Sequence, residues 1–379
     1  MLSKRYPILA IILLVAVVLG SCAPAPAAPT EAPAPPPTEA APAPTQAMEE
    51  PTAEMAAPTE AAGPDLAGMK VAFLFPGVVN DGSYNTLGYN AMLDVEKRFG
   101  LEVQWNERVP PAESPRVIGE FAASGVDAVW AHSGTFFDPV INTAPNFPDV
   151  SFVTYAGLLM ENPPPNVWQQ LNLEAHRQMF FLTGVIAGLT TKSNVIGFVG
   201  GIELTTYVEG LNSFEMGAKW VNPQVQLLRV WTGDFDDAAQ AKEATIGHIE
   251  QGADVIAHAT NLGVYGIVEA IEEHEGVYFI GKDIDQSPLL PDRTLCSMYI
   301  DYSEAMGYVL PKVAAGELGG VYVTSLANGG TKVTDLASFI PADKAAVYNT
   351  IKEMVTSDEI NVRAAAADVV GTLPPVPQP

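Results

Sequence analysis

Three strand-like segments recur in the two halves of the chain, in the same order and at nearly the same offset. The offset is 127 residues from Asp127 to Asp254 and again from Val150 to Val277, and a third matching pair lies 124 residues apart. Each segment is short and apolar, which is typical of buried strands, and amphipathic helical segments lie between them. The repeat therefore predicts an α/β fold with two similar Rossmann-like lobes, each built on a largely parallel sheet.

Two α/β lobes of this kind bring the loops after their strands to one central cleft, where ligands bind preferentially. Polar, aromatic and acidic residues follow the predicted strands, and Lys282 is the only cation nearby. Such a cleft suits a small neutral polar ligand with a flat face, because rings stack on planar groups and carboxylates accept hydrogen bonds from hydroxyl pairs. The candidate ligand-binding residues are Asp81, Ser83, Tyr84, Asn85, His132, Tyr155, Tyr207, Trp231, Asn261 and Asp283.

The first strand and its loop are the best-defined part of this pattern. An apolar run begins at Val71 and breaks at Pro76, and residues 80–85 form a polar loop. Apolar residues then recur every fourth position from Leu87 to Phe99, which predicts a helix. Side chains in the loop, such as those of Asp81 and Ser83, also commonly cap helices, so capping alone would explain them equally well.

The N-terminus has the pattern of an export signal. Lys4 and Arg5 precede an apolar stretch over residues 7–19, and Leu19-Gly-Ser-Cys22 resembles the bacterial lipobox. We expect residues 1–21 to be a lipoprotein signal peptide and Cys22 to be lipidated, which anchors the protein to the outer face of a membrane. The alternative is an ordinary secretory signal with an unrelated cysteine.

Composition sets the limits of the folded part. Residues 22–65 are almost entirely Ala, Pro, Thr and Glu, which predicts a disordered tether, and residues 371–379 are expected to be an unstructured tail. The formal net charge of −25 argues against nucleic acid as a partner. With Cys22 lipidated, Cys296 has no disulfide partner and is expected to be a buried apolar residue.

An enzyme is the main alternative from another class. His132 and His258 end matched strands and Asp283 is predicted nearby, so a metal site or an acid–base pair is conceivable. The sequence has no metal-type histidine spacing, nucleophile elbow or phosphate-binding loop. We therefore expect no catalytic residue, no metal and no cofactor.

Five motifs in order resemble the basic membrane protein family of bacterial lipoproteins, which includes the purine nucleoside receptor of spirochaetes. The first is Asp81-Gly-Ser-Tyr-Asn85, similar to the family signature Asp-x-Ser-aromatic-Asn. The others lie at residues 191–199, 217–223, 251–256 and 281–286, the last as Gly-Lys-Asp-Ile-Asp-Gln.

This resemblance implies the fold of type I periplasmic binding proteins, in which two lobes close over a ligand. The N-terminal lobe would hold residues 66–170 and 299–319, and the C-terminal lobe residues 171–298 and 320–370. It also implies a lipid-anchored protein, facing the outside or the periplasm, that delivers a purine nucleoside or base to an ABC permease. A monomer is expected.

The resemblance further implies roles for individual residues. Tyr84 would stack on the base, with Asn85 and Asp81 at or near the base edge. Asp283 would accept hydrogen bonds from ribose hydroxyls. Either Tyr207 or Trp231 would supply a second ring from the other lobe. Many family members carry Asp where this chain has Ala156, so a free base, a sugar, an amino acid or a signalling molecule stays open as the ligand.

Overall fold

The computed structural model describes residues 65–363 and 373–379. The expected signal peptide, the lipidation site Cys22 and nearly all of the expected tether lie outside the described residues. Within them, no helix is long and apolar enough to cross a membrane.

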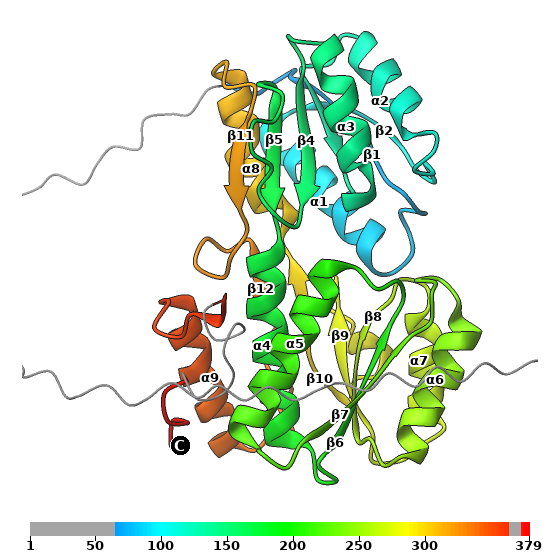
Figure 1. The fold of residues 1–379 in the computed structure, drawn as a ribbon, viewed down its shortest axis with the longest axis vertical. Coiled ribbons are helices and arrows are strands. Elements are labelled where there is room, and N and C mark those ends of the chain that lie inside the picture. Colours follow the sequence, from blue (N-terminus) through cyan, green and yellow to red (C-terminus); the bar gives the residue numbers. More distant parts are fainter. Residues whose placement is uncertain (1–64, 364–372) are drawn as a thin grey trace, which may run out of the picture. The chain divides into compact units, whose positions relative to one another are not determined.

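Six strands form the first sheet: β1 (Lys70–Leu74), β2 (Glu102–Asn106), β3 (Ala128–Ala131), β4 (Ser151–Ala156), β5 (Val167–Leu171) and β11 (Gly320–Val323). Their order is β11-β5-β4-β3-β1-β2, and every neighbouring pair is parallel (Figure 1). Strands β1, β3 and β4 are buried almost throughout, as expected of continuous apolar runs in a parallel sheet. The helices α1 (Tyr84–Phe99), α2 (Ser114–Ala123), α3 (Phe137–Thr143) and α8 (Tyr302–Ala314) accompany this sheet.

The second sheet also has six strands: β6 (Val195–Gly200), β7 (Gln226–Trp231), β8 (Val255–Ala259), β9 (Tyr278–Lys282), β10 (Thr294–Ile300) and β12 (Thr331–Val333). Their order, β12-β10-β9-β8-β6-β7, repeats that of the first sheet, with only β12 antiparallel to its neighbour. The remaining helices are α4 (Leu173–Thr190), α5 (Thr205–Val221), α6 (Ala238–Glu250), α7 (Val264–Glu272) and α9 (Ala342–Thr356). The predicted α/β fold with two repeated lobes is confirmed.

Two strands differ from the expected lobe limits. Strand β10 runs to Ile300 and pairs with β9, so it lies wholly in the second sheet rather than ending at residue 298. Strand β11 starts at Gly320 and pairs with β5, so the first sheet continues beyond residue 319. Strand β11 is a short edge strand with the sequence Gly-Val-Tyr-Val, and its apolar residues do not reveal which of the two sheets it joins.

The chain passes between the sheets three times, and hydrogen bonds join these crossings. Asn172 lies between β5 and α4, and its Oδ1 accepts from Thr324 Oγ1 at 2.7 Å in the segment after β11. Gln170 Nε2 donates to both of these residues. At the crossing between β10 and α8, Asp301 is bonded to Lys332 of β12 at 2.7 Å, and its backbone N–H donates to the carbonyl of Gly330 at 2.9 Å. The three crossings therefore form one bonded region.

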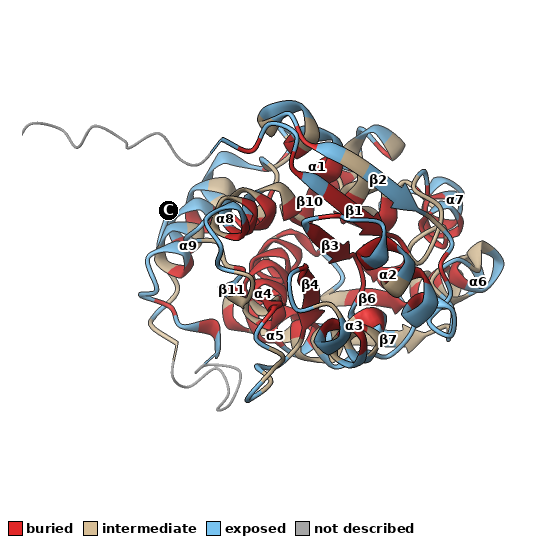
Figure 2. Cartoon of the chain, turned by 90° about the horizontal axis from the view of Figure 1, so that it is seen from above, coloured by how far each residue is buried: buried red, intermediate tan, exposed pale blue. Residues whose placement is uncertain are grey.

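Helix α4 is buried along most of its length against α5 (Figure 2). A side chain at Gly184 would meet the backbone oxygen of Phe214 at 2.0 Å, and one at Gly217 would meet that of Phe181 at 2.3 Å. These glycines therefore permit close contact between the two helices, and the apolar run over residues 174–189 is a core helix.

Residues 373–379, expected to be an unstructured tail, form no helix or strand but contact the folded part. Trp220 Nε1 donates to the carbonyl of Pro374 at 2.9 Å, and Leu373 and Val376 lie against the apolar core. The indole N–H needs an acceptor, and this segment supplies one.

Candidate functional site

Asp81 organises the loop between β1 and α1. Its carboxylate is buried and accepts hydrogen bonds from the backbone of Ser83, and from both the backbone and the side chains of Asn85 and Thr86, at 2.7–3.0 Å. Asp81 thereby caps the first turn of α1, whereas the N-cap residue Ser83 makes no capping bond. Asp81 therefore has the expected capping role, and the Ser83 hydroxyl is available for other contacts.

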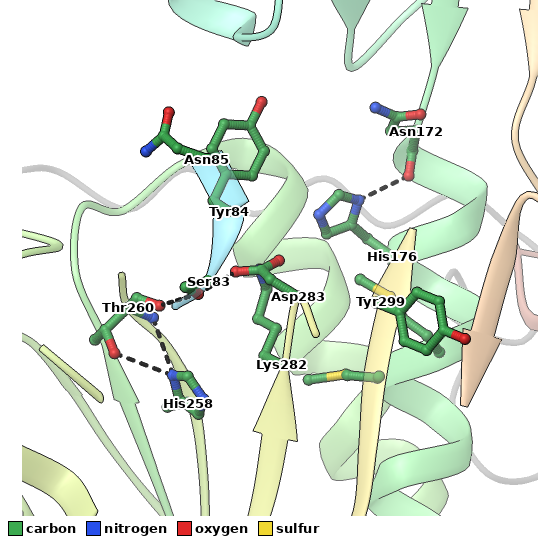
Figure 3. Close-up of polar contacts among 12 residues, drawn as sticks. Ser83, Tyr84, Asn85, Asn172, His176, His258, Thr260, Lys282, Asp283 and Tyr299 are labelled. Atoms are coloured by element: carbon green, nitrogen blue, oxygen red, sulfur yellow. Dashed lines mark hydrogen bonds and ion pairs between the residues drawn. The ribbon is translucent and has the colours of Figure 1, made fainter. Parts of the chain in front are cut away.

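The Ser83 hydroxyl joins the two sheets (Figure 3). Its Oγ lies 2.8 Å from Asp283 Oδ2, after β9, and 3.1 Å from the carbonyl oxygen of Thr260, after β8. A hydroxyl has one hydrogen, so it donates to one of these acceptors at a time. Gln286 Nε2 adds a bond to the carbonyl of Gly82 at 3.3 Å. The first loop is thus held against strand ends of the second sheet.

Asp283 and Lys282 form a buried ion pair beside Ser83. Asp283 has φ +71°, a left-handed conformation that Asp tolerates better than most residues and that is enriched at functional sites. Lys282 Nζ also lies 5.0 Å from the centre of the Tyr207 ring. Burial lowers the pKa of Lys282, but the charge of Asp283 and contact with Tyr207 outweigh it, and the pKa is raised.

Aromatic side chains of the first lobe gather behind the loop. The Tyr84 ring stacks on His132 with centroids 4.5 Å apart, and Tyr155 stacks on Tyr302 at 4.9 Å. His132 Nδ1 lies 2.5 Å from the Tyr155 hydroxyl and Nε2 lies 3.1 Å from the backbone oxygen of Tyr84. Burial raises the pKa of Tyr84 well above its usual value, with further contributions from Tyr155, Tyr207 and Asp283. The ring of Tyr84 thus lies near groups of both lobes.

Three buried histidines surround this region, and all are neutral. Burial lowers the pKa of His132, His176 and His258 to about 4 in each case. His258 is bonded to Gln286 Oε1 at 2.9 Å. Figure 3 shows its bond to Thr260 Oγ1 at 3.0 Å and the contact of His176 Nδ1 with the backbone oxygen of Asn172 at 2.8 Å. These histidines complete hydrogen-bond networks in the interior. Among the described residues, no group of three or more His, Cys, Asp or Glu side chains is arranged to hold a metal ion.

The structure brings together eight of the ten candidate residues through the contacts above: Asp81, Ser83, Tyr84, Asn85, His132, Tyr155, Tyr207 and Asp283. Trp231 lies apart from them, because its ring covers Gly200 and packs against Phe198 at 5.4 Å. The backbone N–H of Asn261 donates to the carbonyl of Phe235 at 2.8 Å. Neither shows a contact with the cluster.

Three members of the site were not among the ten candidates, although Lys282 had been noted as a nearby cation. Tyr302 begins α8, a helix outside the repeated strand ends, so no pattern pointed to it. Gln286 stands in the fifth motif and could have been found there. Lys282 ends β9, and its neighbour Asp283 was the signal for a buried ion pair.

A pocket of about 440 Å³ opens beside the cluster, at the carboxyl ends of β3 and β4. Tyr155 is shared between the pocket and the aromatic group. Ala156, which stands where many resembling sequences have Asp, contributes only a methyl group to its wall. The other lining residues are Gly134, Thr135, Phe137, Asp138, Gly157 and Leu158.

Two similar α/β lobes with bonded strand ends are the architecture seen in a solute-binding protein of an ABC transporter system. A family model described as ABC transporter substrate-binding protein PnrA-like matches residues 69–365, and the chain belongs to this family. The protein is therefore a solute-binding component of an ABC transporter, in a family of substrate-binding proteins rather than enzymes. The resemblance found in the five motifs is confirmed.

Three known proteins illustrate the relationship. Basic membrane protein A of Borreliella burgdorferi is 28% identical over 238 residues, 62% of this chain and 70% of that protein. A purine-binding protein of Brucella abortus is 25% identical over 252 residues, 63% of this chain and 69% of that protein. The structure of a solute-binding protein of an ABC transporter system from Conexibacter woesei superposes with a TM-score of 0.64 at 26% identity, covering 78% of this chain and 98% of that one.

Proposed function

We propose that this protein binds a purine nucleoside or purine base between its two lobes and delivers it to an ABC permease. The observation that carries the proposal is the hydrogen bond from Ser83 Oγ to Asp283 Oδ2, because it places the loop after β1 directly against the loop after β9. Ligands of two-lobed α/β proteins bind where such strand ends meet. A ligand that touches both loops favours closure, since only differential affinity shifts that equilibrium.

The chemistry of the cluster supports a flat, polar ligand. Tyr84, Tyr155, Tyr302 and Tyr207 supply ring faces and hydroxyl groups, and aromatic rings stack on planar bases. Asp283 is the acidic group in contact with both lobes, and we assign it to ribose hydroxyls. Its charge is already balanced by Lys282, so an uncharged ligand adds no unpaired charge to the site. The purine-binding relative from Brucella abortus agrees with this class of ligand.

The candidate roles divide by lobe. In the first, Tyr84 stacks on the base and Asn85 lies near its edge, while Asp81 holds the loop that carries both. In the second, Tyr207 is the second ring, because it lies against Lys282 whereas Trp231 covers Gly200. Because the side chain of Ala156 is only a methyl group, the pocket has room beside Tyr155 for a substituent on the base.

We place the protein at the outer face of a membrane. Cys22 carries the lipid anchor, residues 22–65 are the tether, and the folded part faces the outside or the periplasm as a monomer. Mass spectrometry of the intact exported protein tests the anchor: the mature chain begins at Cys22 and carries the added mass of acyl chains. A mature chain that begins elsewhere would refute it.

The ligand is tested by identifying small molecules that co-purify with the protein. Denaturation in organic solvent releases them, and mass spectrometry assigns their masses. We expect a purine nucleoside or base at a near-equimolar ratio, absent from a Tyr84→Ala control purified in parallel. A co-purifying sugar or amino acid would be compatible with the fold but would overturn the proposed class of ligand.

A further inference from the structure

Tyr84 and His132 bond to each other in both directions. The Tyr84 hydroxyl donates to the backbone oxygen of His132 at 3.4 Å, and His132 Nε2 lies 3.1 Å from the backbone oxygen of Tyr84, while the two rings stack. Tyr84 is partly buried, whereas His132 is fully buried. His132 therefore holds the Tyr84 ring from the interior, on one of the two faces of that ring.

The His132 ring fits against a glycine of helix α1. A side-chain carbon added at Gly88 would lie 2.3 Å from both Cε1 and Nε2 of the ring. Glycine is unfavourable inside a helix, and here it gives the imidazole its space. The rings of Phe75, Tyr155 and Tyr302 lie around it, with centroids 4.7–5.4 Å away. The imidazole is therefore enclosed, and each of its nitrogens faces a hydrogen-bonding partner.

The partner of Nε2 decides which nitrogen of His132 carries the hydrogen. A backbone carbonyl oxygen can only accept, so Nε2 must be the donor to Tyr84. Burial lowers the pKa of His132 to about 4, so at neutral pH the ring is uncharged and holds a single ring N–H. Nδ1 is then a bare acceptor, and the Tyr155 hydroxyl, 2.5 Å away, must donate to it.

Trp130 completes this series of hydrogen bonds from outside the ligand pocket. Its indole nitrogen can only donate, and it donates to the Tyr155 hydroxyl oxygen at 3.1 Å. Trp130 is fully buried in β3, where its ring stacks on Phe73. The indole hydrogen keeps the hydroxyl's own hydrogen away from that side of the oxygen, which leaves His132 as its target. The bonds therefore run in one direction, from Trp130 through Tyr155 and His132 to Tyr84.

We propose that His132 is a positioning residue that holds the Tyr84 ring for stacking as the Nε2–H tautomer, and that Trp130 sets this tautomer through Tyr155. This inference rests on the proposed function, because it assigns the Tyr84 ring to the ligand. With the hydrogen on Nδ1 instead, the lone pair of Nε2 would face the carbonyl oxygen of Tyr84 and repel it. The remaining face of the Tyr84 ring would then be less well aligned for a flat ligand, and the advantage of a preorganised site would be lost.

Nitrogen NMR of protein labelled in its histidine rings reads the tautomer directly, because a bare ring nitrogen and an N–H nitrogen differ in chemical shift. The chain has five histidines, and the signals missing from His132→Gln identify those of His132. Trp130→Phe removes the indole donor. Trp168→Phe is the matched control, because Trp168 is a buried indole of the same sheet that donates to the backbone oxygen of Glu317. Calorimetry with adenosine, guanosine and hypoxanthine measures the affinity of each variant.

In the wild type we expect only the Nε2–H form of His132 at neutral pH. Trp130→Phe should populate the Nδ1–H form and weaken purine binding at least about threefold, while Trp168→Phe should change neither. His132→Gln should retain most of the affinity, because its amide can accept from Tyr155 and donate to Tyr84. His132→Leu can do neither and should lose at least about tenfold.

An Nδ1–H or charged His132 in the wild type would overturn the proposal without any variant. It would also be overturned if Trp130→Phe kept either the tautomer or the affinity of Trp168→Phe, or if His132→Leu bound as tightly as His132→Gln. If the wild type binds none of the purines, the proposed function itself fails, while the spectra still decide the tautomer and its dependence on Trp130.

Discussion

Ser83 Oγ lies 2.8 Å from Asp283 Oδ2, although the two residues are 200 positions apart and follow strands of different sheets. The contact is possible because Asp81, rather than Ser83, caps helix α1. One short loop thus divides two tasks between neighbouring residues: Asp81 fixes the loop, and Ser83 reaches the opposite lobe.

Ser83→Ala should weaken ligand binding by opening the protein. The variant loses a hydrogen bond to a charged group, which typically contributes about 1.5–3 kcal/mol, so we expect about a tenfold or greater loss of affinity. Small-angle scattering should show a larger radius of gyration at subsaturating ligand. Ser213→Ala is the matched control, because Ser213 is equally buried but bonds only to Glu209 in its own helix. Equal affinity in Ser83→Ala and the wild type would contradict the role of this contact.

Asp81→Asn should destabilise the protein as well as weaken binding. An amide has one acceptor oxygen, so several of the donors now served by Asp81 would be left unpaired in a buried site, at a cost of about 1–3 kcal/mol. Denaturant unfolding measures this loss. Asp94→Asn, on the exposed face of the same helix, should change stability by less than about 0.5 kcal/mol. Similar stabilities for the two variants would show that Asp81 does not organise the loop.

Lys282→Met should lower the free energy of unfolding more than any substitution of an exposed residue, because it leaves the Asp283 carboxylate buried without its cation. Breaking a buried ion pair on one side costs about 3–5 kcal/mol. Adding Asp283→Asn should restore part of this stability, since the unpaired charge is then removed. A double-mutant cycle by chemical denaturation gives the coupling energy, and strictly additive effects would be incompatible with a paired site.

Acid should unfold this protein through its buried histidines. His132, His176 and His258 have folded pKa values of about 4, against an ordinary value of 6.5. The unfolded chain therefore binds more protons between these values, and stability that is fully present above pH 6.5 is lost as the pH falls toward 4. Each of these histidines should lower the free energy of unfolding by about 2 kcal/mol as the pH falls from about 7 to about 5.

The pH dependence has a direct control. His258→Gln should unfold with about one proton fewer taken up near pH 5, which appears as a shallower slope of unfolding free energy against pH. A wild-type slope in His258→Gln would mean that His258 is not neutral in the fold.

The repeated strands were predictable because each is a continuous apolar run, and their common offset placed the loops that follow them. Helix α1 was likewise predictable from its four-residue period. The sheet that strand β11 joins was missed because a short apolar run does not reveal its neighbour, and the contacts of residues 373–379 were missed because their partner, Trp220, is remote in sequence.

Within the site, the sequence indicated which loops meet but not which atoms do. The bond between Ser83 and Asp283 depends on the left-handed backbone at Asp283, which no local pattern predicts for an aspartate. Trp231 and Tyr207 looked equivalent after their strands. The choice between them depended on packing, because Gly200 leaves a flat surface that the Trp231 ring covers.

The most direct test of the central claim is calorimetric titration of the wild type and of Asp283→Asn with adenosine, guanosine, inosine, their free bases, glucose and ribose. We predict saturable one-to-one binding of at least one purine compound by the wild type, with Asp283→Asn losing more affinity for nucleosides than for bases. Binding of a sugar by the wild type, with no heat from any purine compound, would contradict it.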